Sequence, residues 1–193
     1  MDSARSRSRE TGFSLVEVLI STGILMTVSL GVAQMFILAG TETRQGKPET
    51  SATALAEQKL EQLRGLTWGF DTEGLGLPAS DTTTSLAKDP PDATGTGLNP
   101  SPADVMEKNT AGFVDFLDGN GAYLGTGTTP PVNTVYIRRW SIEPLPTNPN
   151  NTLILQVFVT TKDREARRGA DTNKRWKLPG DAWLVSIKTR KSS

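Results

Sequence analysis

The chain has 193 residues, with 21 basic and 21 acidic side chains and a formal net charge of zero. Its length fits one domain with an appendage, and its bulk charge indicates no nucleic-acid or membrane-surface partner. It contains neither cysteine nor histidine, which excludes disulfides, thiolate metal sites and histidine-based catalysis. We therefore expect a protein that is not an enzyme and uses no cofactor.

The N-terminal part of the sequence predicts a single membrane crossing. Residues 1–12 are polar and contain three arginines, whereas residues 13–39 are apolar, with Glu17 as the only ionisable residue. A helix of this length spans roughly 40 Å, and the hydrocarbon core of a bilayer is about 30 Å thick. Arginines before a single span keep the N-terminus in the cytoplasm and direct the rest of the chain outward.

Glu17 is an unexpected residue in such a segment. A charged side chain near the bilayer centre costs about 2.5–3.5 kcal/mol. Two interpretations remain open at this point. Either a partner offsets the cost of the Glu17 carboxylate, or the side chain reaches the interface from near the end of a membrane anchor.

Residues 40–65 predict an amphipathic continuation of the same helix. Gly46 and Pro48 are expected to kink or loosen it, and Gly65 is expected to end it. Apolar residues recur at helical spacing and form one stripe, which consists of Ala52, Ala56, Leu60 and Leu63. We expect this half to pack on a globular domain at 66–193.

The globular domain is predicted to begin with loops and to end in strands. Residues 66–132 are rich in Gly, Pro, Thr and Asp, with a short helix expected after Ser101-Pro102. Residues 113–125 contain Asp-Gly and Asn-Gly and predict two short strands around a turn. Three later segments, 134–145, 152–161 and 182–191, are rich in β-branched and aromatic residues. The fold class is therefore α+β, a long helix on an antiparallel sheet of about four strands.

Alternation and charge add two expectations for the last third. One strand face should carry Leu153, Leu155, Val157 and Val159, and another Trp183, Val185 and Ile187. By count, residues 66–132 carry nine acidic and two basic side chains, and residues 133–193 carry five acidic and twelve basic ones. These opposite charges either offset each other within one fold or form complementary faces of subunits.

The segment Gly12–Ser21, "GFSLVEVLIS", resembles the processing site of type IV prepilins and type II secretion pseudopilins. A secretory signal would have a shorter apolar stretch and a small-residue cleavage site after it. The resemblance implies a pilin-like fold and cleavage between Gly12 and Phe13 by a prepilin peptidase, which also methylates the Phe13 amine. It further implies that Glu17 pairs with the N-terminal amine of a neighbouring subunit during filament assembly.

Residues 51–66, "SATALAEQKLEQLRGL", are similar to the corresponding helix of minor pilins of the pilus-modification type and of I-type pseudopilins. The implied partners are other pilins, the prepilin peptidase, the inner-membrane assembly platform and, before assembly, membrane lipid. The implied location is the inner membrane, then a surface pilus or a periplasmic pseudopilus. A membrane-anchored extracytoplasmic ligand-binding module that does not polymerise is the alternative of another class.

Two further sites are hypotheses, each with a simpler alternative. Oxygen ligands on a loop suggest calcium, although a hairpin turn explains the same residues, Asp115, Asp118 and Asn120. Basic residues near a tryptophan suggest contact with nucleic acid, although a solvated loop between strands explains them equally. These residues are Arg167, Arg168, Lys174, Arg175 and Trp176.

Overall fold

The computed structural model describes residues 12–70, 74–170 and 177–191, and it describes residues 41–48 and 170 by their backbone alone. The chain forms two compact units, Met1–Gln45 and Gly46–Ser193. One helix, α1 (Leu15–Gly65), contributes to both.

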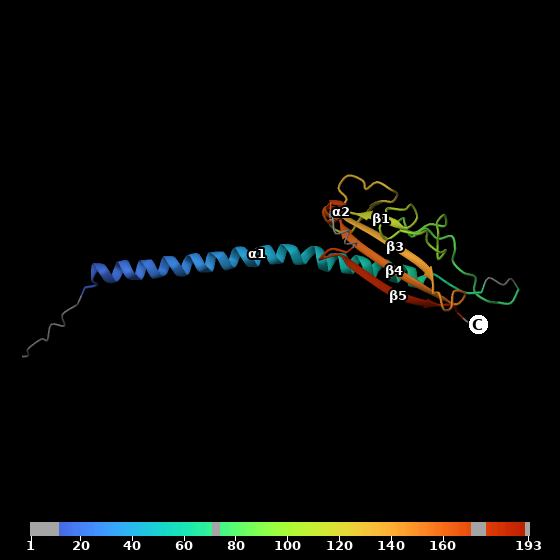
Figure 1. Cartoon of the computed structure of the whole chain (residues 1–193), viewed down its shortest axis with the longest axis horizontal. Helices are drawn as coiled ribbons and strands as arrows, with labels where there is room; N and C mark the ends of the chain where they lie inside the picture. Colours follow the sequence, from blue (N-terminus) through green and yellow to red (C-terminus); the bar gives the residue numbers. More distant parts are fainter. Residues whose placement is uncertain (1–11, 71–73, 171–176, 192–193) are drawn as a thin grey trace, which may run out of the picture. The chain divides into compact units, whose positions relative to one another are not determined.

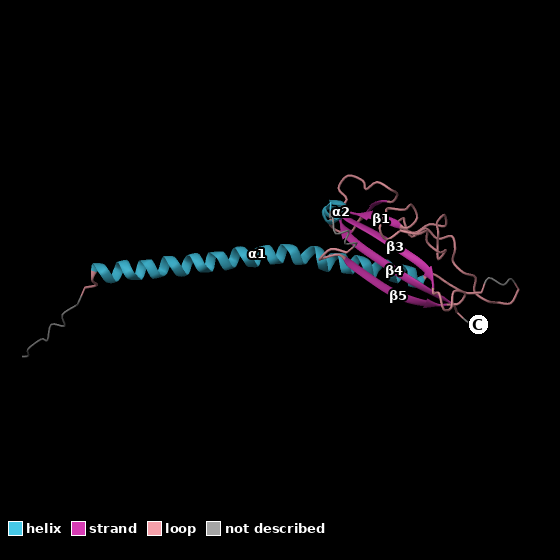
Figure 2. Cartoon of the chain, in the orientation of Figure 1, coloured by secondary structure: helices cyan, strands magenta, loops and turns pink. Residues whose placement is uncertain are grey.

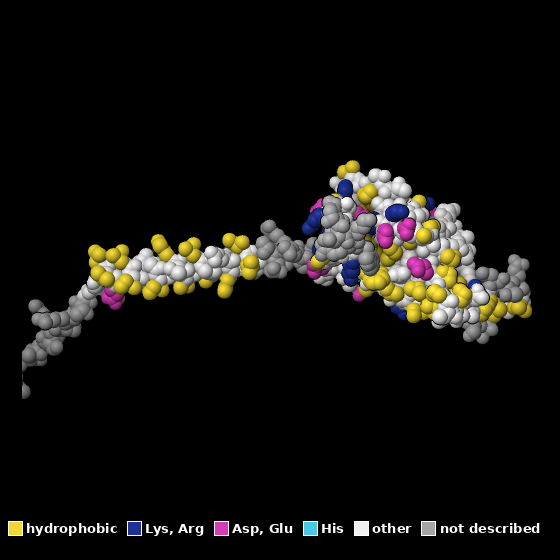
Figure 3. Space-filling model, in the orientation of Figure 1, with side chains coloured by type: hydrophobic (Ala, Val, Ile, Leu, Met, Phe, Trp, Pro, Cys, Tyr) yellow, Lys and Arg dark blue, Asp and Glu magenta, His cyan; other side chains and the backbone are white. Residues whose placement is uncertain are grey.

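The first unit contains the apolar part of α1. The segment Leu15–Gly40 has 26 residues and a mean hydropathy of 2.0, and none of it is buried within the molecule. Figure 3 shows hydrophobic side chains along this helix. Its length and composition suffice to cross a membrane, in agreement with the predicted span. The helix assignment continues through Gly46 and Pro48, and the predicted kink there stays a prediction.

The second unit is built on a five-stranded sheet with the order β2-β1-β3-β4-β5, in which all neighbours are antiparallel (Figures 1 and 2). The strands are β1 (Val114–Leu117), β2 (Tyr123–Gly125), β3 (Tyr136–Pro144), β4 (Thr152–Thr161) and β5 (Ala182–Thr189). The α+β class is confirmed. The sheet has five strands and not about four, because the β1–β2 hairpin pairs with β3 and extends the sheet.

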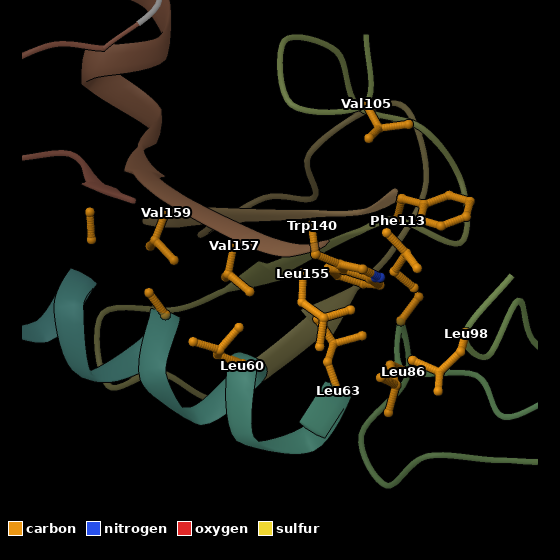
Figure 4. Packing of buried hydrophobic residues seen from close by; sticks show 14 of the residues in the cluster. Leu60, Leu63, Leu86, Leu98, Val105, Phe113, Trp140, Leu155, Val157 and Val159 are labelled. Atoms are coloured by element: carbon orange, nitrogen blue, oxygen red, sulfur yellow. The ribbon is translucent and has the colours of Figure 1, made fainter. Parts of the chain in front are cut away.

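The C-terminal part of α1 packs on one face of this sheet. The predicted stripe Ala52, Ala56, Leu60 and Leu63 is buried and shares one core cluster with the β3 and β4 side chains. Figure 4 shows Leu60 and Leu63 pointing towards Leu155 and Trp140. Full burial of a leucine or valine side chain contributes about 1.5–3 kcal/mol, so this contact is a principal stabilising interaction of the unit.

The alternation along the strands is as predicted, but its two faces differ in environment. Leu153, Leu155, Val157 and Val159 belong to the buried cluster. Trp183, Val185 and Ile187 lie on the opposite face of β5 and are 38%, 52% and 62% exposed. Figure 3 shows hydrophobic side chains along this strand. β5 therefore has an outward apolar face.

The segment after β4 is a helix, which corrects the predicted loop. α2 (Lys162–Ala170) carries acidic residues in its first turn and basic residues in its last, as the helix dipole favours. The Arg164 amide donates to Thr161 Oγ1 at 3.3 Å, so Thr161 caps the helix start.

The short helix predicted after Ser101-Pro102 is wrong. Residues 103–107 form turns, and Asp104 has a φ of 63°, which a right-handed helix does not accommodate. Ser101 is held by β3 instead, because its amide donates to the Ile142 oxygen at 2.9 Å and its hydroxyl accepts from the Ile142 amide at 3.1 Å. The segment thus extends the hydrogen bonding of β3 beyond the end of β1.

Candidate processing and assembly site

The predicted processing site lies just before α1 begins. Gly12, Phe13 and Ser14 precede the helix, and the Phe13 side chain is 81% exposed. A Cβ added at Gly12 would meet no atom within 4 Å. The peptide bond between Gly12 and Phe13 therefore lies outside the helix, in an exposed segment.

Glu17 lies in a local sequence pattern that the sequence interpretation missed. The Val18 amide donates to the Ser14 oxygen at 3.2 Å, which places Ser14 at the position just before the first helical turn. Glu17 follows three residues later, and this spacing is the capping-box pattern of Ser and Glu. The signal was present in the sequence as "SLVE", inside the segment that matched a different motif.

Two free energies show how far a position at the helix start can account for the charge of Glu17 in an apolar segment. A carboxylate in the first helical turn gains about 0.3–1 kcal/mol from the helix dipole. The cost of a charge in the middle of a bilayer is about 2.5–3.5 kcal/mol. The helix dipole therefore offsets a part of the cost at most, and it leaves room for a partner of the Glu17 carboxylate.

Two hydroxyl groups in the apolar segment already have acceptors. Thr22 Oγ1 donates to the Val18 oxygen at 2.6 Å, and Thr27 Oγ1 donates to the Gly23 oxygen at 2.9 Å. Such bonds to the preceding turn satisfy a hydroxyl inside a membrane helix. These two threonines consequently need no partner from another chain, in contrast to the charged Glu17.

The model of the prokaryotic N-terminal methylation motif matches residues 7–33. The chain carries the N-terminal methylation motif of type IV prepilins and pseudopilins. The match contains Gly12, Phe13 and Glu17 and more than half of the apolar segment of α1. No curated protein and no solved structure matches the chain.

The prepilin-type motif confirms the resemblance found in the sequence and supports the type IV pilin and pseudopilin family, which is a family of structural proteins. It implies assembly interactions of the kind that pilins make, and one apolar helix consistent with a single-pass anchor. The individual roles of Gly12, Phe13 and Glu17 stay predictions.

The structure places the three predicted calcium ligands in different roles. Asp115 is buried, and its Oδ2 atom lies 2.8 Å from both Lys59 Nζ and Arg138 Nη2. Asp118 Oδ1 accepts from the Asn120 and Ala122 amides, each at 2.8 Å, which is how an aspartate stabilises a turn. Within the described ranges no group of three or more His, Cys, Asp or Glu is placed to hold a metal ion. The geometry therefore favours the hairpin turn.

Asp115 belongs to a buried ionic network that joins α1 to the sheet. Lys59 Nζ also donates to the Leu86 oxygen at 2.5 Å and lies 4.5 Å from the centre of the Trp140 ring. Burial lowers the pKa of Lys59 to about 8, and the nearby Asp115 carboxylate opposes this shift. Arg138 Nη1 donates to the Leu55 oxygen of α1 at 2.9 Å.

A sequence signal for this network existed. Lys59 lies three residues after Ala56 and four before Leu63, a spacing that places it beside the apolar stripe of the helix.

The basic cluster of the nucleic-acid hypothesis is partly internal. Arg168 forms ion pairs with Glu165 and with Asp181, the latter at 2.6 Å, and its guanidinium lies 4.9 Å from the Phe158 ring. Its charge is thus compensated inside the fold. Arg167 is exposed, and Lys174, Arg175 and Trp176 lie outside the described residues. The structure therefore removes Arg168 from the set of available cations.

Proposed function

We propose that the protein is a minor pilin, a low-abundance structural subunit that is incorporated into a type IV pilus or primes it. The observation that carries this proposal is the prepilin-type motif at residues 7–33, fused to an apolar helix that continues into an α+β domain. An anchored ligand-binding module would need a membrane helix, but neither the glycine-phenylalanine boundary nor a glutamate four residues after it.

In this proposal a prepilin peptidase removes residues 1–12 on the cytoplasmic side and methylates the amine of Phe13. Before assembly, residues 13–39 cross the inner membrane and the domain at 66–193 lies outside the cytoplasm. The arginines of the leader favour this orientation. The subunit then contacts the assembly platform and other pilins, and residues 40–65 connect the membrane segment to the domain.

Glu17 supplies the charge for subunit recognition in this proposal. Its carboxylate and the Phe13 amine of a neighbouring subunit have opposite charges, and in an apolar setting their attraction offsets desolvation. The pair forms when a subunit leaves lipid and enters the filament. The unpaired Glu17 carboxylate raises the free energy of the subunit in lipid, so pairing favours assembly. It favours the one register that brings the two opposite charges together.

A pseudopilin of a type II secretion system is the second candidate. The similarity of residues 51–66 to both minor pilins and I-type pseudopilins supports it equally. The long Gly-, Pro- and Thr-rich loops of residues 66–132 favour a subunit of low copy number over a densely repeated shaft subunit in either system. Neighbouring genes distinguish the two, because pilus assembly genes favour the first and an outer-membrane secretion operon favours the second.

The processing step is tested with Gly12→Val. We expect this variant to keep its leader, since a branched side chain at the boundary blocks the peptidase, and mass spectrometry should find an N-methylated Phe13 in the wild type but not in Gly12→Val. Gly31→Val is the matched control, because a Cβ at either glycine meets no atom within 4 Å. A stable N-terminus at Met1 in cells with active peptidase would overturn the proposal.

The assembly step is tested with Glu17→Ala and Glu17→Gln. Both variants should be cleaved and inserted in the membrane, and both should be depleted from sheared filaments. Gln34→Ala is the control, since it removes a polar but uncharged side chain from the same apolar segment. Equal amounts of wild type and Glu17 variants in the filament fraction would contradict the role of the carboxylate.

A further inference from the structure

A depression lies at the C-terminal end of α1, at the ends of several elements of the sheet. Its volume is about 270 Å³. Trp68 follows the helix, Pro144 ends β3, Leu153 lies near the start of β4, and Arg190 follows β5. The remaining lining residues are Leu98, Pro100 and Pro149 and four uncharged polar residues, Ser80, Thr82, Asn99 and Asn150. This site is remote in sequence from the prepilin-type motif, so the inference does not depend on the proposed function.

Arg190 is the distinctive residue of this depression. Its guanidinium carbon lies 5.1 Å from the centre of the Trp68 ring and 5.1 Å from that of Phe70. The Nε atom is buried and has no hydrogen-bond partner. The backbone fixes the position, because the Arg190 amide donates to the Asn151 oxygen and the next amide to the Trp68 oxygen, each at 2.9 Å.

The residues around Arg190 define the chemistry of a ligand. A guanidinium presents a planar fork of donors that matches a carboxylate in a bidentate geometry. Among the described residues that line the depression, Arg190 is the one cation, which favours a singly charged anion over a phosphate dianion. Trp68, Leu153 and the prolines offer apolar surface, and proline has no amide donor.

The size of the depression sets a further limit. Pockets for small-molecule ligands are usually about 300–1,000 Å³, so 270 Å³ holds one or two amino-acid side chains. We propose that this depression binds a carboxylate presented by a polypeptide. The carboxylate belongs either to an Asp or Glu side chain beside an apolar residue, or to an apolar residue at a chain end.

The proposal is tested by NMR on the full chain in detergent micelles, with ¹⁵N in arginine and tryptophan. The probes are N-acetyl-Leu-Glu-amide for the side-chain source, N-acetyl-leucine for the chain end, and the uncharged N-acetyl-Leu-Gln-amide. We expect at least one carboxylate probe to shift the Arg190 Nε–H and Trp68 Nε1–H signals saturably. The uncharged peptide and sodium acetate should not do so at the same concentration.

Variants of Arg190 test whether its guanidinium donors are what binds the carboxylate probes. Arg190→Gln should weaken binding about tenfold or more, as expected for the loss of a charged hydrogen bond, and Arg190→Lys should fall between it and the wild type. Arg64→Gln is the control, because Arg64 is an exposed arginine that pairs with Glu61 at the end of α1. If Arg190→Gln does not fold, Arg190→Lys decides. The proposal is overturned if neither carboxylate probe binds, if acetate or the amide peptide binds equally, or if the deciding variant retains full affinity.

Discussion

At the scale of single residues, Asp115 is notable as a charged side chain that is buried in an ionic network. It is buried between two cations, Lys59 and Arg138, with no more than a few per cent of any of these side chains exposed. Two positive charges and one negative charge are thus held out of water together. Such a network is weak evidence for stability in itself, but removing one member leaves charges without compensation.

Asp115→Asn should therefore destabilise the domain strongly. The variant keeps the shape of the side chain but leaves Lys59 and Arg138 without a counter-charge, and we expect a loss of about 3–5 kcal/mol in the free energy of unfolding. Glu61→Gln is the matched control, because its partner Arg64 is also exposed and such pairs contribute about 1 kcal/mol or less. Chemical unfolding followed by near-UV circular dichroism measures both. Similar losses in the two variants would contradict the assigned role of Asp115.

Lys59 should make stability depend on pH. Its pKa is about 8 in the fold, lowered by burial from 10.5. Between these values the unfolded chain holds a proton that the folded chain has released, so the Lys59 contribution to the free energy of unfolding rises with pH. Below pH 8 both states are protonated, and the full cost of burying the charge is present.

The comparison of wild type with Lys59→Met isolates this contribution. Between pH 7.5 and 10 the stability of the wild type relative to the variant should increase by about 2 kcal/mol. The subtraction removes the effects of other groups, such as Lys188, whose pKa is also lowered by burial. A difference that stays constant over this pH range would show that Lys59 does not titrate there.

At the scale of elements, β4 and β5 show why alternation alone does not identify the core face. Leu155 of β4 is fully buried beneath α1, whereas Ile187 of β5 is 62% exposed on the other face. Both belong to regular apolar alternations in the sequence. We expect Leu155→Ala to lower the free energy of unfolding by about 2–5 kcal/mol, and Ile187→Ala to change it by about 0.5 kcal/mol or less.

Thermal or chemical unfolding of the two alanine variants tests this assignment of faces. A large loss for Ile187→Ala would mean that the outer face of β5 is covered in the folded chain.

The elements that the sequence predicted correctly have strong local signals. The helix stripe and the three long strands are continuous periodic patterns, and the prepilin-type motif is a linear segment that needs no knowledge of the fold. α2 was missed because it is short and polar, and it is held by ion pairs from Arg168 and Arg139 to residues distant in sequence.

The depression beside Arg190 was missed for a related reason. Trp68, Pro144 and Arg190 come together through the sheet topology, which no local pattern encodes.

At the scale of the whole molecule, the division between Gln45 and Gly46 predicts that the second unit folds alone. A fragment of residues 46–193 should be soluble without detergent and keep its β-sheet circular dichroism spectrum, because its core cluster contains no residue before Ala52. A fragment of residues 61–193 is the comparison. It lacks Ala52, Ala56 and Leu60 of the stripe and should aggregate. Aggregation of the longer fragment, with folding of the full chain in detergent, would contradict this boundary.

No residue of the segment Leu15–Gly40 is buried, and this has a consequence for the surroundings that the helix requires. Lipid tails and the apolar surface of another protein are almost equivalent solvents for leucine, isoleucine and valine side chains. Transfer of the helix from lipid to a protein surface therefore changes the free energy of its apolar side chains only a little. Their van der Waals contacts hardly favour one environment over the other. Glu17 is the only ionisable residue in this segment, and it alone responds strongly to a change of dielectric or to a nearby ion. A single carboxylate can thus determine the partition of a helix between two otherwise similar solvents.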